Sequence, residues 1–308
     1  MLSRIAESLF WIGRYIERAE ATARFLDVHL RLLVEDPWTS EPDACGDLLS
    51  LMGVQSDEPS RDELIRLLSD DPASPASIVS CWRYARDNAR RAREVIPSEV
   101  WEVINTTWHQ VPVDRRDRRI SFFEWARGRS ALFSGTARGS MVHDDGWQFL
   151  IMGRHLEQAD MTSRLVAAST LVETNPWPAV LRGCGAHDAF LRMYRGVQAD
   201  REVAEFLLLD QRFPRSIMYG LDGVERSLEM ITPARHTAAG RRHEAHDALQ
   251  LIGKMRAELT YTPMPEILEQ LNERMADVQS TCDAATKIIS SSFFSVDDLT
   301  AWTTEGTR

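Results

Sequence analysis

The chain of 308 residues is long enough for one large domain or two modest ones, each with a buried core. Charged residues make up 27% of the chain and hydrophobic residues 44%, a balance typical of soluble globular proteins rather than of disordered or membrane-spanning chains. The 46 acidic and 36 basic residues give a formal net charge of -10, which excludes a general electrostatic attraction to nucleic acid or to an anionic membrane.

The cysteine spacing and the first twenty residues narrow the class of protein further, because they bear on its redox compartment and on membrane targeting. Neither a CxxC pair for zinc nor a dense disulfide framework is present, so we expect reduced thiols and a cytoplasmic protein. Charged residues interrupt the first twenty positions, and the sequence therefore predicts neither a secretory signal nor a transmembrane span there. The four cysteines are Cys45, Cys81, Cys184 and Cys282.

Hydrophobic periodicity predicts an all-α fold, because apolar residues recur at three and four positions and hairpin signals are missing. The first helix is expected to begin at about Ser3, a good N-cap, and to end at about Val34. A capping box over Ser60 to Glu63 predicts the start of another helix, and Ser74-Pro75 predicts a proline in the first turn of the next. Further proline and glycine breaks divide the chain into about a dozen helices.

The most informative pattern is an internal repeat. Residues 13 to 24 read GRYIERAEATAR and residues 153 to 164 read GRHLEQADMTSR, with matching Gly, Arg, Glu, Ala, Thr and Arg at a constant offset of 140. A Cys-Gly pair recurs at Cys45-Gly46 and Cys184-Gly185, and LLSDDPASPASI, which ends at Ile78, parallels LLLDQRFPRSI, which ends at Ile217. The pattern indicates one duplicated domain over 1–308, with repeats of about 1–138 and 139–308.

Two long copies favour a pseudo-twofold bundle over a solenoid. Equivalent elements often meet at such an axis, and the natural candidates are the two motif-bearing helices, which are expected to begin near Ser3 and near Asp144. The carboxylate of Asp144 is well placed to cap the second of them. Gly13 and Gly153 predict a close approach of the two backbones, since a glycine inside a helix otherwise costs about 1 kcal/mol relative to alanine.

On a helical wheel, the charged residues of each motif form a stripe directly beside the apolar stripe. Four acids and four arginines make a neutral set, which favours a structural ion-pair network, because an unpaired buried charge costs several kcal/mol. Within the first helix, Arg14 is expected to reach Glu17 at i+3 and Glu20 to reach Arg24 at i+4, and the second helix repeats both spacings. The set consists of Arg14, Glu17, Glu20, Arg24, Arg154, Glu157, Asp160 and Arg164.

Two alternative interpretations stay open. In one, the four carboxylates of Glu17, Glu20, Glu157 and Asp160 bind a metal, although helical dinuclear sites normally include a histidine at i+3, which this chain lacks. In the other, the arginines grip a peptide terminus or a phosphate in a bidentate manner. No cofactor is predicted, because the sequence contains no P-loop, no GxGxxG after a strand, no GxSxG elbow and no catalytic cysteine setting.

At Gly13 to Arg24 and Gly153 to Arg164 the chain resembles the bacterial alpha-E domain family, a helical group named for a Glu-Arg motif, here Glu17-Arg18. Further similarity lies in SPASIVSCWRYARDNARRARE and LFSGTARGSMVHDDGWQFLIMGR, so it covers essentially the whole length. The second copy has Glu157-Gln158 in place of Glu-Arg. The resemblance implies a companion of circularly permuted ATP-grasp ligases and of transglutaminase-like cysteine peptidases, in a system that forms or modifies peptides.

Together these observations predict a non-catalytic helical scaffold or substrate-presenting accessory protein of such a ligase system. The alternative is an enzyme that acts on a peptide-like substrate through the duplicated acids and arginines, with or without a metal. The expected partners are an ATP-grasp type ligase and a transglutaminase-like protein, with no nucleic acid and no membrane, and a homodimer is possible. Arg18 joins the predicted binding or structural network through the Glu-Arg motif.

Overall fold

The computed structural model describes residues 3–35, 40–112, 119–171, 176–194, 199–231 and 239–294. These residues form an all-α bundle without a strand. The α-helices are α1 (Ser3–Glu35), α2 (Glu41–Leu51), α3 (Arg61–Ile65), α4 (Ile78–Arg91), α5 (Ser98–His109), α6 (Arg119–Ser140), α7 (Asp145–Ala167), α8 (Trp177–Gly183), α9 (His187–Tyr194), α10 (Asp200–Leu209), α11 (Ile217–Ile231), α12 (Ala239–Tyr261), α13 (Met264–Glu269) and α14 (Leu271–Ile289). Short π-helical turns extend α3 (Arg66–Asp70) and α14 (Ser290–Phe294), and a 3-10 turn extends α7 (Ala168–Leu171).

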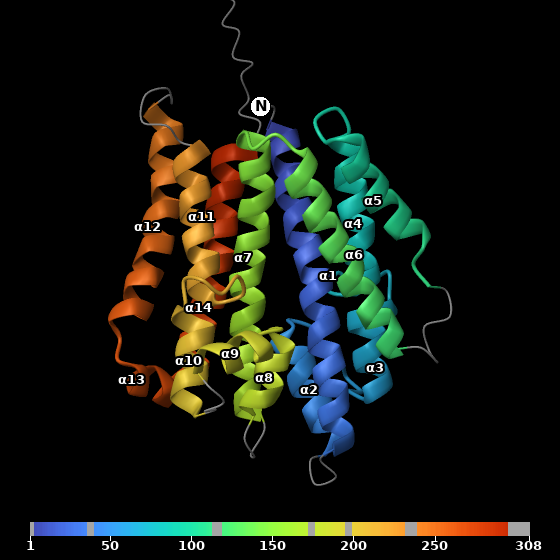
Figure 1. The fold of residues 1–308 in the computed structure, drawn as a ribbon, viewed down its shortest axis with the longest axis vertical. Helices are drawn as coiled ribbons and strands as arrows, with labels where there is room; N and C mark the ends of the chain where they lie inside the picture. The colour runs from blue at the N-terminus through green and yellow to red at the C-terminus, as the bar shows by residue number, and fades with distance from the viewer. Residues whose placement is uncertain are drawn as a thin grey trace, which may run out of the picture.

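The centre of the bundle is a parallel pair of long helices, α1 and α7 (Figure 1). Helices α4 and α6 pack against α1, and α11 and α14 pack against α7. The outer helices α5 and α12 complete the two sides, and the short helices α2, α3, α8, α9 and α10 gather near the carboxyl ends of the central pair (Figure 1). The two helices that carry the repeated motif therefore make the most extensive contact in the described structure.

Local capping explains where several helices begin. The Ser60 hydroxyl accepts a hydrogen bond from the Glu63 amide at 3.2 Å, as the capping box predicts. The Asp144 carboxylate accepts hydrogen bonds from the Gly146 and Trp147 amides and caps α7. The prediction for Ser74-Pro75 was wrong: α4 begins at Ile78, because the Ser77 hydroxyl accepts a hydrogen bond from the Ser80 amide.

Helices α1 and α7 touch through their backbones. A Cβ atom built on Gly13 would lie 2.1 Å from the Leu150 carbonyl oxygen, and one built on Gly153 would lie 2.1 Å from the Phe10 carbonyl oxygen. Both separations are far inside van der Waals contact, so only glycine is compatible with this crossing. The close approach that the two glycines predict is therefore present, and it is reciprocal between the helices.

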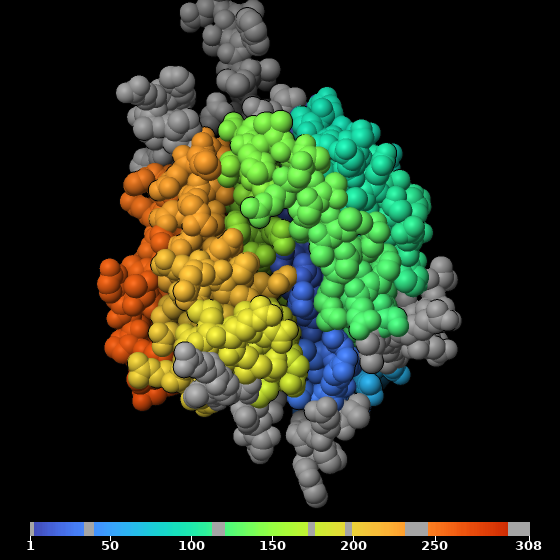
Figure 2. Space-filling model, viewed as in Figure 1, coloured from blue at the N-terminus to red at the C-terminus, as the bar shows by residue number. Residues whose placement is uncertain are grey.

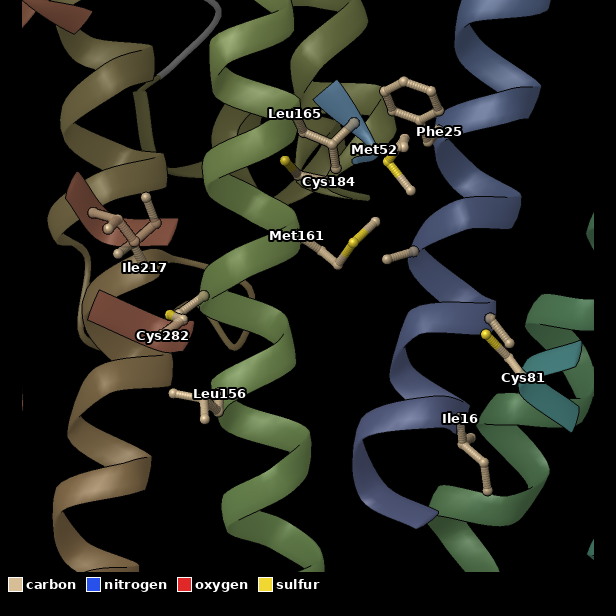
Figure 3. Packing of buried hydrophobic residues seen from close by; sticks show 14 of the residues in the cluster. Ile16, Phe25, Met52, Cys81, Leu156, Met161, Leu165, Cys184, Ile217 and Cys282 are labelled. Atoms are coloured by element: carbon tan, nitrogen blue, oxygen red, sulfur yellow. The ribbon is translucent and has the colours of Figure 1, made fainter. Parts of the chain in front are cut away.

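The hydrophobic core surrounds this central pair. Its largest fully buried side chains include Phe10 and Phe25 of α1, Trp82 of α4 and Phe123 of α6. Figure 3 shows Met161 and Leu165 of α7 directed toward α1. The burial of large apolar side chains from both halves of the chain couples the halves into one packed body.

The contacts in the two halves correspond to each other. Helices α4 and α11 both begin after a Ser-Ile step, Ser77-Ile78 and Ser216-Ile217, and each serine hydroxyl donates to the carbonyl oxygen of an aspartate six residues earlier. Each of these helices packs against the motif helix of its own half. The common origin of the two halves, and a boundary at residue 138, stay predictions of the sequence.

Candidate functional site

The central helices exchange salt bridges across their interface. The Arg14 guanidinium on α1 pairs with Glu157 on α7, and the Arg154 Nε donates to the Glu17 Oε2 at 2.8 Å in the opposite direction. The expected i+3 pairs within each helix, Arg14 with Glu17 and Arg154 with Glu157, were wrong. Because the helices cross at Gly13 and Gly153, each arginine reaches the neighbouring helix.

The residue after each glutamate reinforces the exchanged pair. The Arg18 Nε donates to the Glu157 Oε1 at 2.5 Å and its second guanidinium nitrogen donates to Oε2 at 3.0 Å, which is a bidentate contact. In the second copy, Gln158 lies beside Glu17 instead and helps to lower the pKa of that carboxyl. The Glu-Arg motif thus acts between helices: its arginine binds the glutamate of the other copy.

Two further pairs of the motif, one within each helix, join residues four positions apart. Arg24 donates to Glu20 at 2.9 Å, and Arg164 donates to Asp160 through two nitrogens at 3.1 Å. Arg164 also donates to the Leu51 carbonyl oxygen at 2.5 Å, at the end of α2. Arg24 lies correspondingly at the end of α8, with its Nη1 2.9 Å from the Cβ position of Gly185. Both guanidinium groups therefore face the negative end of a short helix dipole.

The network divides into two clusters. The Glu157 cluster consists of Arg14, Arg18, Glu157, Asp160 and Arg164, and the Glu17 cluster consists of Glu17, Glu20, Arg24, Arg154 and Arg215. Arg215 pairs with Glu20 from the segment before α11. Each cluster therefore holds three arginines and two carboxylates, so neither is neutral. The sequence predicted a neutral set of four acids and four arginines. Two further arginines join the acids in the structure: Arg18, for which no partner was predicted, and Arg215, which was not predicted at all.

The four carboxylates do not converge. Glu17 and Glu20 belong to one cluster and Glu157 and Asp160 to the other, and each carboxylate faces at least one arginine. Over the part of the chain that the structure describes, no group of three or more His, Cys, Asp or Glu side chains is arranged to hold a metal ion. The donor set therefore suits arginine pairing rather than a four-carboxylate metal centre.

Burial and pairing act in opposite directions on the carboxylates. Desolvation raises the pKa of Glu157, but Arg14 and Arg18 outweigh it and lower the pKa to about 2. Asp160 has a raised pKa, because burial and the neighbouring Glu157 outweigh its pairing with Arg164. Glu157 is fully buried and ionised, so the Glu157 cluster is held together by charge-assisted hydrogen bonds.

Two histidines, the buried His29 and the half-buried His155, predict a pH dependence of stability. Burial lowers the pKa of His29 and of His155 from 6.5 to about 4. The unfolded chain takes up protons on both imidazoles near pH 6.5, whereas the folded chain does not, so the free energy of unfolding falls as the pH drops from 6.5 toward 4. Each group contributes about 2 to 3 kcal/mol to this loss.

His29→Leu is therefore expected to flatten the decline in urea unfolding free energy between pH 7 and pH 4.5 relative to the unmodified chain. The matched control is His246→Gln, which replaces an exposed histidine of α12 and should leave the decline unchanged. An equally steep decline in His29→Leu would contradict a neutral buried imidazole at this position.

The four cysteines are buried thiols. Burial raises the pKa of Cys45 to about 11 and the pKa of Cys81 and Cys184 to about 12, and it raises that of Cys282 well above 9. We expect the folded protein to react with less than about one equivalent of a thiol-specific disulfide reagent at pH 8 and the unfolded protein with about four, because the thiolate is the reactive form. Rapid modification of one thiol before unfolding would contradict this expectation.

None of the helices in the described ranges combines the length and the apolar character that a transmembrane span requires.

Comparison with known proteins identifies relatives of this chain. The Alpha-E family, described as a predicted alpha-helical domain with a conserved ER motif, matches residues 1–294. Uncharacterized proteins of Mycobacterium bovis and of Mycobacterium tuberculosis strain CDC 1551 are each 26% identical over 262 residues, and one of strain H37Rv is 25% identical. These alignments cover 73% of this chain but only 29% of each relative. No solved structure matches the chain significantly.

Proposed function

Because the chain belongs to the Alpha-E family, we propose that it is a non-catalytic helical scaffold, or substrate-presenting accessory protein, of a system that forms or modifies peptides. Its proposed partners are an ATP-grasp type amide ligase and a transglutaminase-like protein, and its proposed location is the cytoplasm. The observation that carries the proposal is the pairing of all four motif carboxylates with arginines.

The pairing leaves the motif poorly suited to acid-base or nucleophilic chemistry. A general base must reach a substrate proton with a free lone pair, and its pKa lies best near the working pH. Glu157 instead accepts hydrogen bonds from Arg14 and Arg18 and has a pKa of about 2. The buried thiols have raised pKa values, which disfavours the nucleophilic thiolate. These properties support a rigid protein that binds its partners rather than one that catalyses a reaction.

The relatives support a modular role. The chain matches 29% of the length of each mycobacterial relative, so a related unit occurs there within a much longer polypeptide. A helical unit with a tightly packed centre can present surfaces to neighbouring domains or partners without changing its own core.

The proposal is tested by purifying the tagged protein from its native host under gentle conditions and identifying the proteins that accompany it. We expect an ATP-grasp type ligase at comparable stoichiometry, and its activity on a peptide substrate should fall when the helical protein is omitted. A preparation without any such ligase, together with a ligase that works equally well alone, would overturn the proposal.

Elemental analysis and a matched variant separate the scaffold from the enzyme alternative. Stoichiometric iron, manganese or zinc in the purified protein would favour an enzyme that acts through the duplicated carboxylates. In a scaffold, Glu157→Gln should mainly lower stability, whereas in an enzyme it should lower turnover by itself at nearly unchanged stability.

A further inference from the structure

One side of α1 carries an uninterrupted stripe of charge. Its members are spaced by three or four residues, which places them on one helix face over roughly 20 Å. The stripe consists of Glu17, Glu20, Arg24, Asp27 and Arg31. On α7 the corresponding stripe contains only three charged residues, because alanine and leucine occupy the equivalents of Asp27 and Arg31. The two clusters therefore differ in how far they extend.

Arginines from three other elements reach this stripe. Arg154 of α7 donates to Glu17 at 2.8 Å, Arg127 of α6 donates to the Asp27 Oδ2 at 3.0 Å, and Arg215, which precedes α11, pairs with Glu20. The elements that contribute them surround a hollow in the surface, between α6 and α11, with α1 and α7 at its floor (Figure 2). We call this hollow the α6–α11 groove.

The groove carries excess positive charge. Five arginines (Arg24, Arg31, Arg127, Arg154 and Arg215) face three carboxylates (Glu17, Glu20 and Asp27), although the whole chain has a net charge of -10. Four of these arginine side chains are between 21% and 24% exposed, so they are accessible without being fully hydrated. The negative end of the α8 helix dipole is equivalent to about half an elementary charge at most, so part of the positive charge of the groove remains uncompensated.

Two guanidinium groups converge at one point of the groove. The Nη1 atoms of Arg24 and Arg215 lie 2.9 and 3.8 Å from the position that a Cβ atom of Gly185 would occupy. Gly185 has a φ of 61°, in the region that favours glycine, and a Cβ atom there would press against the Arg24 guanidinium, so glycine allows Arg24 to lie directly against this turn. Burial and the adjacent Arg215 lower the pKa of Arg24, as expected where two cations crowd together.

We propose that the α6–α11 groove binds an oxyanion, the carboxylate or phosphate group of a small ligand, between Arg24 and Arg215 beside Gly185. Planar guanidinium groups bind both kinds of oxyanion through paired hydrogen bonds, and an added negative charge compensates the excess of the groove. The neighbouring Gln158 and the neutral His155 add no competing charge. Binding at this site requires no partner protein, so the outcome of its test is independent of the proposed scaffold role.

The test is calorimetric titration of the full chain with inorganic phosphate and, separately, with citrate, each at an ionic strength held constant with chloride. We expect saturable binding of at least one of them in the unmodified chain and at least tenfold weaker binding in Arg215→Gln. The matched control, Arg212→Gln, removes an exposed arginine that pairs with Asp210 two residues away and should change binding less than twofold. Phosphate binding alone indicates a phosphate ligand, and citrate binding alone indicates a carboxylate ligand.

Asp27→Asn supplies a test of opposite sign, which stays informative if Arg215→Gln fails to fold. Removal of this half-buried carboxylate increases the positive excess of the groove, so we expect several-fold tighter binding. Absence of binding by both anions at millimolar concentration, or equal weakening by Arg212→Gln and Arg215→Gln, would overturn the proposal.

Discussion

Gly13→Ala and Gly153→Ala are each expected to destabilise the protein by about 3 kcal/mol, the upper range for overpacking of a tight contact. Each added methyl group would lie 2.1 Å from a backbone carbonyl oxygen of the opposite helix, so α1 and α7 would have to move apart. Backbone atoms cannot rotate away as a flexible side chain can. Helix propensity by itself favours alanine over glycine by about 1 kcal/mol, so the predicted loss of stability is due entirely to the contact between the two helices.

Gly128→Ala is the matched control for this prediction. Gly128 lies within α6, and a Cβ atom built there meets nothing within 4 Å. This substitution should stabilise the protein by up to about 1 kcal/mol. Urea unfolding followed by circular dichroism measures all three variants. Equal effects of the three substitutions would show that α1 and α7 do not touch at these glycines in solution.

Glu157→Gln is expected to cost about 3 to 5 kcal/mol in unfolding free energy at pH 7, because it leaves the positive charges of the buried Arg14 and the half-buried Arg18 without their carboxylate. The cost should shrink as the pH falls from about 4.5 toward 2. The folded pKa of Glu157 is lowered to about 2, so its stabilisation is complete above the unfolded pKa and is lost as the folded carboxyl takes up a proton.

Glu63→Gln is the control, since it removes the same charge from a surface salt bridge. Its partner Arg66 is 52% exposed, and such pairs contribute about 1 kcal/mol or less. Denaturant titrations at pH 7 and at pH 3 compare the two variants. A loss below about 1 kcal/mol for Glu157→Gln at pH 7 would contradict the assignment of Glu157 as the anchor of its cluster.

Much of the architecture could be predicted from the sequence. Periodicity of three and four predicted the helices, and the repeated Gly-Arg-x-x-Glu pattern singled out the two helices that meet at the centre. The two glycines predicted the close crossing. Glycine in the middle of a helix lowers its stability, and a close contact between helices compensates for this cost. The resemblance of the Glu-Arg motif to the alpha-E family was confirmed by the match over residues 1–294.

The pairing of the charges could not be predicted in the same way. A helical wheel shows which residues share a face of one helix, and it therefore suggested Arg14 with Glu17, but the crossing geometry brings Arg14 to Glu157. Arg215 was missed because it lies outside both motif helices. The repeat does contain one sign of this residue: at the position that corresponds to Arg215, the first copy has the uncharged Ala76. Function depends on surfaces and partners, for which helical periodicity carries no information.

The most direct test of the exchanged network is a double-mutant cycle on the pair formed by Arg154 and Glu17, using Arg154→Met, Glu17→Gln and the double variant. If the two side chains stabilise the contact between α1 and α7 together, the double variant should be more stable than the sum of the single losses predicts, with a coupling of about 2 kcal/mol. Losses that add within about 0.5 kcal/mol would contradict an exchanged salt bridge between the central helices.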